Sequence, residues 1–178
     1  RDAVAILGGG VSGLLHLLAA RAAGAGPIVV IEPSDPRRAA ALRLGADAAL
    51  PPGREAVEAA LRAAGGRVDH VIVCTGARAA FEQALELAGP GATISLFAPL
   101  EPGEVLPLPV AAIWKRGVRL VPSYAGPPEE MRAALDLIAS GRIDVAALVT
   151  HRLPLERIGE GFRLAAEGGE TLKVLIEP

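Results

Sequence analysis

The chain has 178 residues, of which 51% are hydrophobic and 3% aromatic, and its formal net charge is −2. This length holds one well-cored domain but not two full ones, and the charge excludes the basic surface that nucleic acids or anionic membranes require. No apolar run approaches the roughly 20 residues of a membrane span, no signal peptide opens the chain, and a single cysteine, Cys74, indicates a reducing, cytoplasmic setting.

Strands and helices alternate along the chain, which predicts a parallel sheet covered by helices on both faces. Strands are expected at 3–8, 27–32, 47–50, 68–74, 92–97 and 118–123. Helices are expected at 11–24, 36–44, 54–64, 78–87, 110–116 and 127–140. The second helix is predicted to begin with Asp35 as its N-cap and Pro36 as its first residue. The segment 99–109 contains four prolines and is expected to be a loop or an extended arm.

The pattern changes near Ile143, beyond which we expect a strand at 146–151, a helix at 155–167 and a strand at 172–176. The six earlier strands fill a doubly wound, Rossmann-type sheet, so this C-terminal tail is expected to dock outside it. We therefore predict a dinucleotide-binding domain at 1–142 and a tail at 143–178. Because Arg1 and Asp2 lead directly into a core strand, we interpret the chain as a domain cut from a longer protein.

Three spaced glycines follow the first strand, and they are the most informative feature of the chain. Gly8, Gly10 and Gly13 have the spacing of the G-x-G-x-x-G motif. The first permits a tight turn, the second lets the backbone approach a pyrophosphate, and the third lets the new helix pack closely on the sheet. The positive end of that helix would face the pyrophosphate.

An acidic residue, Glu32, ends the second strand, where a carboxylate can accept hydrogen bonds from both hydroxyls of an adenosine ribose. Its charge would repel a 2′-phosphate, which favours NAD over NADP. Arg37 and Arg38 follow closely and present the opposing argument, since arginines near this position can bind a 2′-phosphate.

Taken together, these segments resemble the cofactor-binding domain of medium-chain, zinc-type alcohol dehydrogenases, in the branch of the sorbitol and threonine dehydrogenases. The resemblance covers the whole chain. It rests on segments whose order and spacing match, namely 8–13, 31–32, 44–47, 68–69, 74–76, 91–92, 123–126, 150–155 and 172–174.

The resemblance implies a role for individual residues. The amides of Val11 and Ser12 would hold the pyrophosphate, Glu32 the adenosine ribose, and Arg37 the edge of that ribose. The nicotinamide side would be formed by Thr75, Ala98 and the backbone near Pro122 and Tyr124. Lys173 would lie against the pyrophosphate, with the tail folded over the cofactor. The chain departs from the family at Val73 and at Phe97, which stands where a glycine is common and would narrow the nicotinamide pocket.

The family transfers hydride between nicotinamide and an alcohol bound to zinc. The candidate zinc ligands in this chain are Cys74, His16, His70 and His151, and they have no ligand spacing. We therefore expect no metal site and no catalytic residue here. The zinc would belong to a missing catalytic domain, and the parent enzyme would act on a small alcohol or polyol.

Two other functions use the same fold: a non-catalytic nucleotide-sensing module and, with a poorer match to the tail and sixth strand, a methyltransferase that binds S-adenosylmethionine. The strand at 118–123 would be a sheet edge rich in β-branched residues, which predicts a homodimer through this strand with Trp114 nearby. The alternative is an edge covered by the arm at 99–109.

Overall fold

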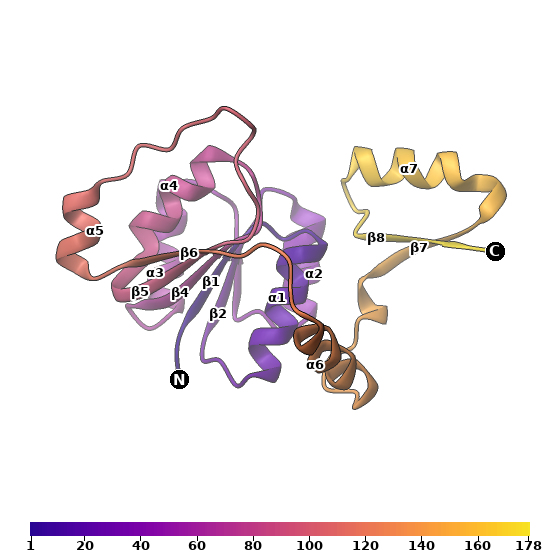
Figure 1. Cartoon of the computed structure of the whole chain (residues 1–178), viewed down its shortest axis with the longest axis horizontal. Coiled ribbons are helices and arrows are strands. Elements are labelled where there is room, and N and C mark those ends of the chain that lie inside the picture. Colours follow the sequence, from indigo (N-terminus) through magenta and orange to yellow (C-terminus); the bar gives the residue numbers. More distant parts are fainter. The chain divides into compact units, whose positions relative to one another are not determined.

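Six parallel strands form the central sheet in the order β3-β2-β1-β4-β5-β6 (Figure 1). The sheet belongs to the first of two compact units, Arg1–Gly126 and Pro127–Pro178, in a computed structural model that describes residues 1–178. This order confirms the doubly wound fold, because the chain crosses from β3 back to β4 beside β1. The strands are β1 (Val4–Leu7), β2 (Ile28–Ile31), β3 (Ala48–Leu50), β4 (Val68–Val73), β5 (Ala88–Leu96) and β6 (Arg119–Pro122).

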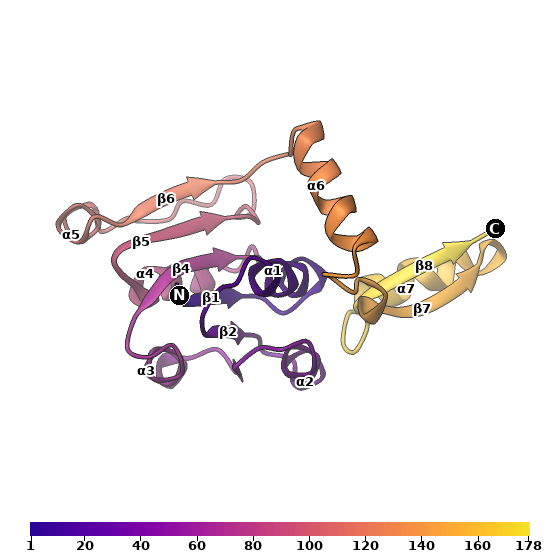
Figure 2. The same ribbon diagram turned by 90° about the horizontal axis from the view of Figure 1, so that it is seen from below.

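Helices cover both faces of this sheet, with α1 and α2 on one side and α3, α4 and α5 on the other (Figure 2). The strands β1 and β2 are buried along their whole length, as expected of strands packed on both faces. The helices are α1 (Val11–Ala22), α2 (Asp35–Arg43), α3 (Arg54–Ala63), α4 (Arg78–Leu87) and α5 (Val110–Arg116).

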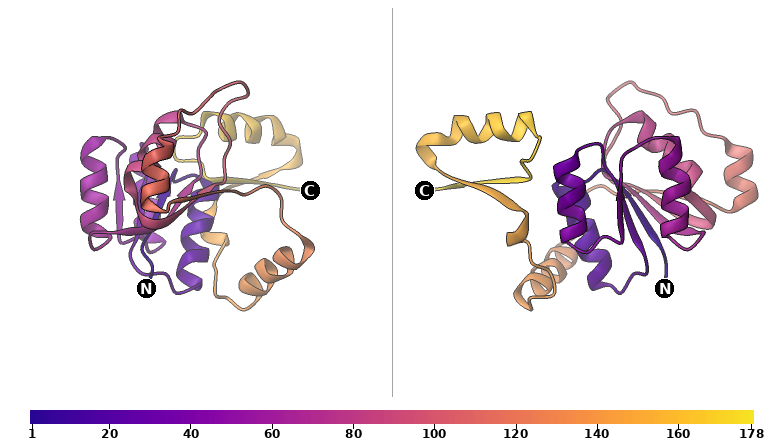
Figure 3. Two further views of the ribbon diagram at one scale, coloured as in Figure 1. Left: turned by 60° about the vertical axis from the view of Figure 1, so that its left-hand side comes forward. Right: turned by 180° about the vertical axis from the view of Figure 1, so that it is seen from behind.

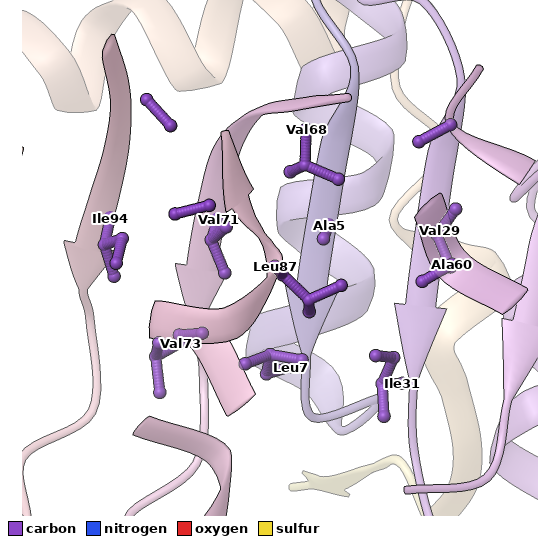
Figure 4. Packing of buried hydrophobic residues seen from close by; sticks show 14 of the residues in the cluster. Ala5, Leu7, Val29, Ile31, Ala60, Val68, Val71, Val73, Leu87 and Ile94 are labelled. Carbon is purple, nitrogen blue, oxygen red and sulfur yellow. The ribbon is translucent and has the colours of Figure 1, made fainter. Parts of the chain in front are cut away.

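The larger apolar core lies on the α3 and α4 face, where aliphatic side chains fill the space between helices and strands (Figure 4). Helix α3 contributes only alanines to the buried cluster, and Ala60 is fully buried. Small residues let that helix approach the sheet closely, which suits a chain with few aromatic side chains. The labelled residues of this core come mainly from the strands, among them Leu7, Val71 and Ile94.

Two of the element boundaries that differ from the sequence-based expectation have a clear structural reason. Helix α2 has Ser34 as its N-cap rather than Asp35, which is already helical, so Pro36 stands one position further in. Strand β5 begins at Ala88 rather than Ala92, because Ala88 pairs with Val68 before the register shifts. The Gly-Pro-Gly sequence that follows Ala88 therefore lies within the strand at its irregularity, where Gly91 has a φ of +75°.

The second unit contains helix α6 (Pro128–Ala139) and a small β-α-β arrangement whose strands form their own parallel pair (Figure 3). Its other elements are the 3-10 turn η1 (Ala146–Leu148), β7 (Val149–Pro154), the 3-10 turn η2 (Leu155–Arg157), α7 (Ile158–Glu167) and β8 (Lys173–Glu177). The expected strand at 146–151 was wrong over its first three residues, which form η1, and η2 replaces the start of the expected helix.

The tail lies outside the six-stranded sheet, as the sequence predicted. The two compact units meet between Gly126 and Pro127, before α6. The sequence suggested a domain boundary after α6, at residue 142, and that boundary stays a prediction. None of the helices has both the length and the apolar character that crossing a bilayer requires.

Candidate functional site

The glycine-rich turn leaves the carboxyl end of β1 in a shape that only glycine permits. Gly8 has a φ of +102°, and a Cβ added to it would lie 3.2 Å from the carbonyl oxygen of Cys74. A Cβ on Gly13 would lie 1.8 Å from the carbonyl oxygen of Gly8, so α1 packs directly on the turn. These are the mechanical roles that the motif predicts for its first and third glycines.

The N-terminus of α1 opens onto this turn without a capping side chain. Its N-cap is Gly10, no side chain caps the first turn, and no acidic residue stands there. The amides of Val11 and Ser12 belong to that turn. A helix end of this kind offers backbone N–H groups and a positive dipole to an anion.

Glu32 is buried behind the turn, with only 4% of its surface exposed. Its Oε2 accepts a hydrogen bond from the N–H of Gly9 at 2.6 Å, and its Oε1 accepts one from the N–H of Ser34 at 2.9 Å. A Cβ on Gly9 would lie 2.9 Å from the Cγ of Glu32, which explains why the residue between Gly8 and Gly10 is also glycine. An ionised carboxylate has about four acceptor positions, so two remain for hydroxyl groups.

The two arginines beyond β2 have different surroundings. Arg38 donates from Nη1 to the carbonyl oxygens of Glu32 and Pro33, both at 2.7 Å, and forms an ion pair with Asp35. Arg38 therefore stabilises the loop after β2. Arg37 instead lines the cleft in front of the glycine turn.

That cleft has a volume of about 550 Å³ and lies between the carboxyl ends of the strands and helices α3 and α4. We call it the β1–β4 cleft. It brings together five of the residues that the sequence assigned to the cofactor, namely Gly8, Gly10, Glu32, Arg37 and Thr75, and Cys74 also lines it. Thr75 thus lies in the same cleft as Glu32.

A second cleft, of about 430 Å³, lies at the ends of β5 and β6 beneath the arm at 99–109, and we call it the β5–β6 cleft. Its walls are mostly leucine and phenylalanine side chains. Three residues assigned to the nicotinamide side, Ala98, Pro122 and Tyr124, line it together with Phe97. Lys173 belongs to β8 of the second unit, so its role beside the pyrophosphate stays a prediction.

A contact between α1, β4 and β5 was missed by the sequence reasoning. The Nδ1 of His16 lies 2.8 Å from the carbonyl oxygen of Ser12 and 3.5 Å from the Sγ of Cys74. The imidazole also meets the ring of Phe97 in a T-shaped contact, with centroids 4.6 Å apart. The four-residue spacing of Ser12 and His16 was a visible signal, but the other two contacts are not local in sequence.

Burial raises the pKa of the Cys74 thiol to about 12. The thiol is therefore protonated near neutral pH and is a poor nucleophile and metal ligand.

No group of three or more His, Cys, Asp or Glu side chains is placed to hold a metal ion. The histidines lie on separate elements: His70 has its Nε2 3.2 Å from Asp2, and His151 has its Nδ1 3.0 Å from Thr150. The residues present do not provide the three protein ligands of a catalytic zinc site.

The strand order, the glycine turn and the buried acid at the end of β2 define a dinucleotide-binding α/β domain. The profile of the zinc-binding dehydrogenase family matches residues 12–140, and the chain belongs to this family. It corresponds to the C-terminal, cofactor-binding part of these enzymes.

Relatives of known function are similar along nearly the whole chain. An alcohol dehydrogenase of Cupriavidus necator is 35% identical and covers 99% of this chain. Geraniol dehydrogenase of Castellaniella defragrans is 36% identical, and sorbitol dehydrogenase of Mus musculus is 33% identical, each covering 98% of this chain. The match takes in 50%, 48% and 49% of these relatives, so this chain spans about half their length.

Solved structures show the same fold. A zinc-binding dehydrogenase from Sinorhizobium meliloti, determined with NADP, superposes with a TM-score of 0.89 at 32% identity and covers 99% of this chain and 52% of its own. A zinc-binding dehydrogenase from Clostridium scindens has a TM-score of 0.92 at 26% identity, with 99% and 50% covered.

Proposed function

We propose that this chain is the NAD-binding part of a zinc-dependent dehydrogenase that interconverts an alcohol or polyol and the corresponding carbonyl compound. The observation that carries the proposal is the buried carboxylate of Glu32, hydrogen-bonded to the glycine turn at the mouth of the β1–β4 cleft. The alcohol, geraniol and sorbitol dehydrogenases among the relatives support the reaction class.

The β1–β4 cleft fits the adenosine and pyrophosphate parts of a dinucleotide. Gly10, Val11, Ser12 and Gly13 present backbone to the pyrophosphate, and a Cβ on Gly10 would have no closer neighbour than Arg37 Nη1 at 3.9 Å. The space that a Cβ would fill is thus left to the ligand. Glu32 would accept the ribose hydroxyls.

NAD is the proposed dinucleotide rather than NADP. A 2′-phosphate beside Glu32 would bring two negative charges together at a carboxylate that is 4% exposed. Arg38 is committed to Asp35 and to the backbone after β2, whereas Arg37 and Arg54 line the cleft. The relative from Sinorhizobium meliloti was solved with NADP, so a direct comparison of the two ligands is required.

The nicotinamide would extend toward the β5–β6 cleft, where Ala98, Pro122 and Tyr124 lie. Bound there, it would accept or donate the hydride. The zinc and the substrate site would belong to a part of the parent protein that this chain does not contain. The free thiol of Cys74 fits a reducing, cytoplasmic compartment.

We also propose that two copies pair through β6, which forms one edge of the sheet. Val121 is 44% exposed on this edge, and Trp114 on α5 is 79% exposed. An open edge with exposed apolar side chains is a template for pairing with a second sheet.

Isothermal titration calorimetry with NAD, NADP and ADP-ribose tests the proposal. We expect both NAD and ADP-ribose to bind, and NAD to bind at least about tenfold more tightly than NADP. Tighter binding of NADP would contradict the choice of cofactor. Absence of binding by all three ligands at millimolar concentration would contradict dinucleotide binding. It would also count against the alternative of a non-catalytic module that senses these nucleotides.

A further inference from the structure

The contact between Phe97 and His16 lies between the two clefts. Phe97 lines the β5–β6 cleft, while Cys74, which is also in contact with His16, lines the β1–β4 cleft. A ligand that occupies both clefts must therefore pass this group of side chains.

The strand order sets the path of such a ligand. Glu32 follows β2, and the helix N-terminus that receives the pyrophosphate follows β1. The next strands across the sheet are β4 and then β5, whose carboxyl ends lead to Cys74 and Phe97. The half of the dinucleotide beyond the pyrophosphate thus meets these residues, in line with binding at the carboxyl ends of strands at a topological switch point.

The imidazole of His16 is held in one orientation. The carbonyl oxygen of Ser12 can only accept a hydrogen bond, so Nδ1 of His16 carries the proton and donates it. The T-shaped contact then limits the movement of the Phe97 ring, which keeps 41% of its surface exposed. Phe97 therefore presents an oriented aromatic surface.

We infer that Phe97, positioned by His16, contacts the nicotinamide ring and selects for its oxidised form. This inference rests on the proposed function. The oxidised ring is a cation and is attracted by the negative face of an aromatic ring, whereas the reduced ring is neutral. A glycine or an aliphatic residue at this position lacks that attraction.

The decisive variant is Phe97→Leu, which keeps an apolar side chain but removes the aromatic ring. Calorimetric titration with oxidised NAD, NADH and ADP-ribose separates the contributions. We expect oxidised NAD to bind about three- to tenfold more weakly to the variant, NADH to change less than about twofold, and ADP-ribose, which lacks the nicotinamide, to stay unchanged.

The measured quantity is the ratio of the dissociation constants of NADH and oxidised NAD. His16→Ala is expected to change this ratio in the same direction as Phe97→Leu but by less, because it frees the Phe97 ring without removing it. Phe97→Tyr should retain the wild-type ratio. Two controls match these changes: Leu15→Ala on the same helix, where Leu15 is 38% exposed, and Phe162→Leu, where Phe162 is 72% exposed on α7. Both should leave the ratio of the dissociation constants of NADH and oxidised NAD unchanged.

Equal weakening of oxidised NAD and NADH in Phe97→Leu would overturn the inference, as would no change in either. An equal loss of ADP-ribose affinity would also overturn it, because the substitution would then act on the whole site. If ADP-ribose fails to bind the wild-type chain, the proposed function itself fails, and the two failures are thereby distinguished.

Discussion

The N–H of Gly9 donates a 2.6 Å hydrogen bond to the carboxylate of Glu32, 23 residues further along the chain. This bond joins the turn that would receive the pyrophosphate to the side chain that would receive the ribose. The recognition of the two ligand parts would therefore be coupled through one buried carboxylate, which also accepts the N–H of Ser34.

Replacing Glu32 with alanine should lower both stability and NAD affinity. The amides of Gly9 and Ser34 would lose a charged acceptor in a buried setting, which predicts a decrease of about 2–4 kcal/mol in the free energy of unfolding. Urea denaturation measures this decrease, and calorimetry measures NAD binding at a temperature where the variant is folded. Glu58→Ala is the control, since that side chain is 77% exposed and should change stability by less than about 0.5 kcal/mol. Wild-type stability in the Glu32 variant would show that the carboxylate does not support the turn.

The second and third motif glycines should respond differently to alanine. Gly10 has a φ of −71° and nothing within 3.9 Å of an added Cβ, so Gly10→Ala should fold normally but bind NAD at least about tenfold more weakly. Gly13→Ala places its Cβ against the Gly8 carbonyl and should destabilise the fold by about 3 kcal/mol or more. Thermal denaturation and calorimetry on both variants separate the two effects. Loss of stability in Gly10→Ala, or its retention in Gly13→Ala, would contradict this division of roles.

The segment from β1 to β2 was predictable from sequence because its signals are local. An apolar run, spaced glycines and a terminal acid each have a direct structural meaning, and Gly8, Gly13 and Glu32 lie where the motif requires. The N-cap of α2 was mistaken because Ser34 and Asp35 are both good capping residues and pattern alone does not choose between them.

Other parts of the site depend on contacts between distant segments. The approach of His16 to Phe97 brings α1 against the residue that follows β5, which no spacing in the sequence reveals. Likewise, the start of β5 at Ala88 depends on its pairing with Val68, and the Gly-Pro-Gly sequence is locally typical of a turn.

Stability at low pH should depend on Asp69. Its Oδ2 accepts the N–H of Ala3 at 2.9 Å, and this bond, together with the nearby Arg67 guanidinium, holds the pKa of Asp69 below its ordinary value. A lowered pKa in the folded state gives stability that is fully present above the ordinary value of about 3.9 and is lost as pH falls through the lowered value.

The variant Asp69→Asn removes this charge while keeping an oxygen acceptor. We expect it to be less stable than the wild type at pH 7, with the difference shrinking as pH falls below about 4. Urea denaturation at several pH values gives the free energy of unfolding of the wild type and of the variant as a function of pH. A difference that stays constant between pH 7 and pH 3 would show that the charge of Asp69 contributes nothing.

Cys74 should react slowly with thiol reagents in the folded protein. With its pKa raised to about 12 by burial, its thiolate fraction at pH 7.5 is about 10³-fold smaller than that of a free cysteine. Iodoacetamide labelling followed by mass spectrometry should therefore be slow in the native chain and fast in urea. Labelling at the rate of free cysteine under native conditions would contradict the burial of the thiol, and a parallel denaturation curve excludes unfolding as its cause.

The edge strand β6 provides the test of dimer formation. Val121↔Ser95 is a paired position within the sheet, and Val121 is 44% exposed, so lysine is sterically acceptable there in the monomer. If two copies pair through β6, Val121→Lys places like charges close to the two-fold axis and weakens association by about tenfold or more. Sedimentation equilibrium measures the dissociation constant. Leu42→Lys is the control, because Leu42 is 50% exposed on α2, away from this edge. A wild-type chain that remains monomeric at high concentration contradicts the dimer, and an undiminished dimer in Val121→Lys contradicts pairing through β6.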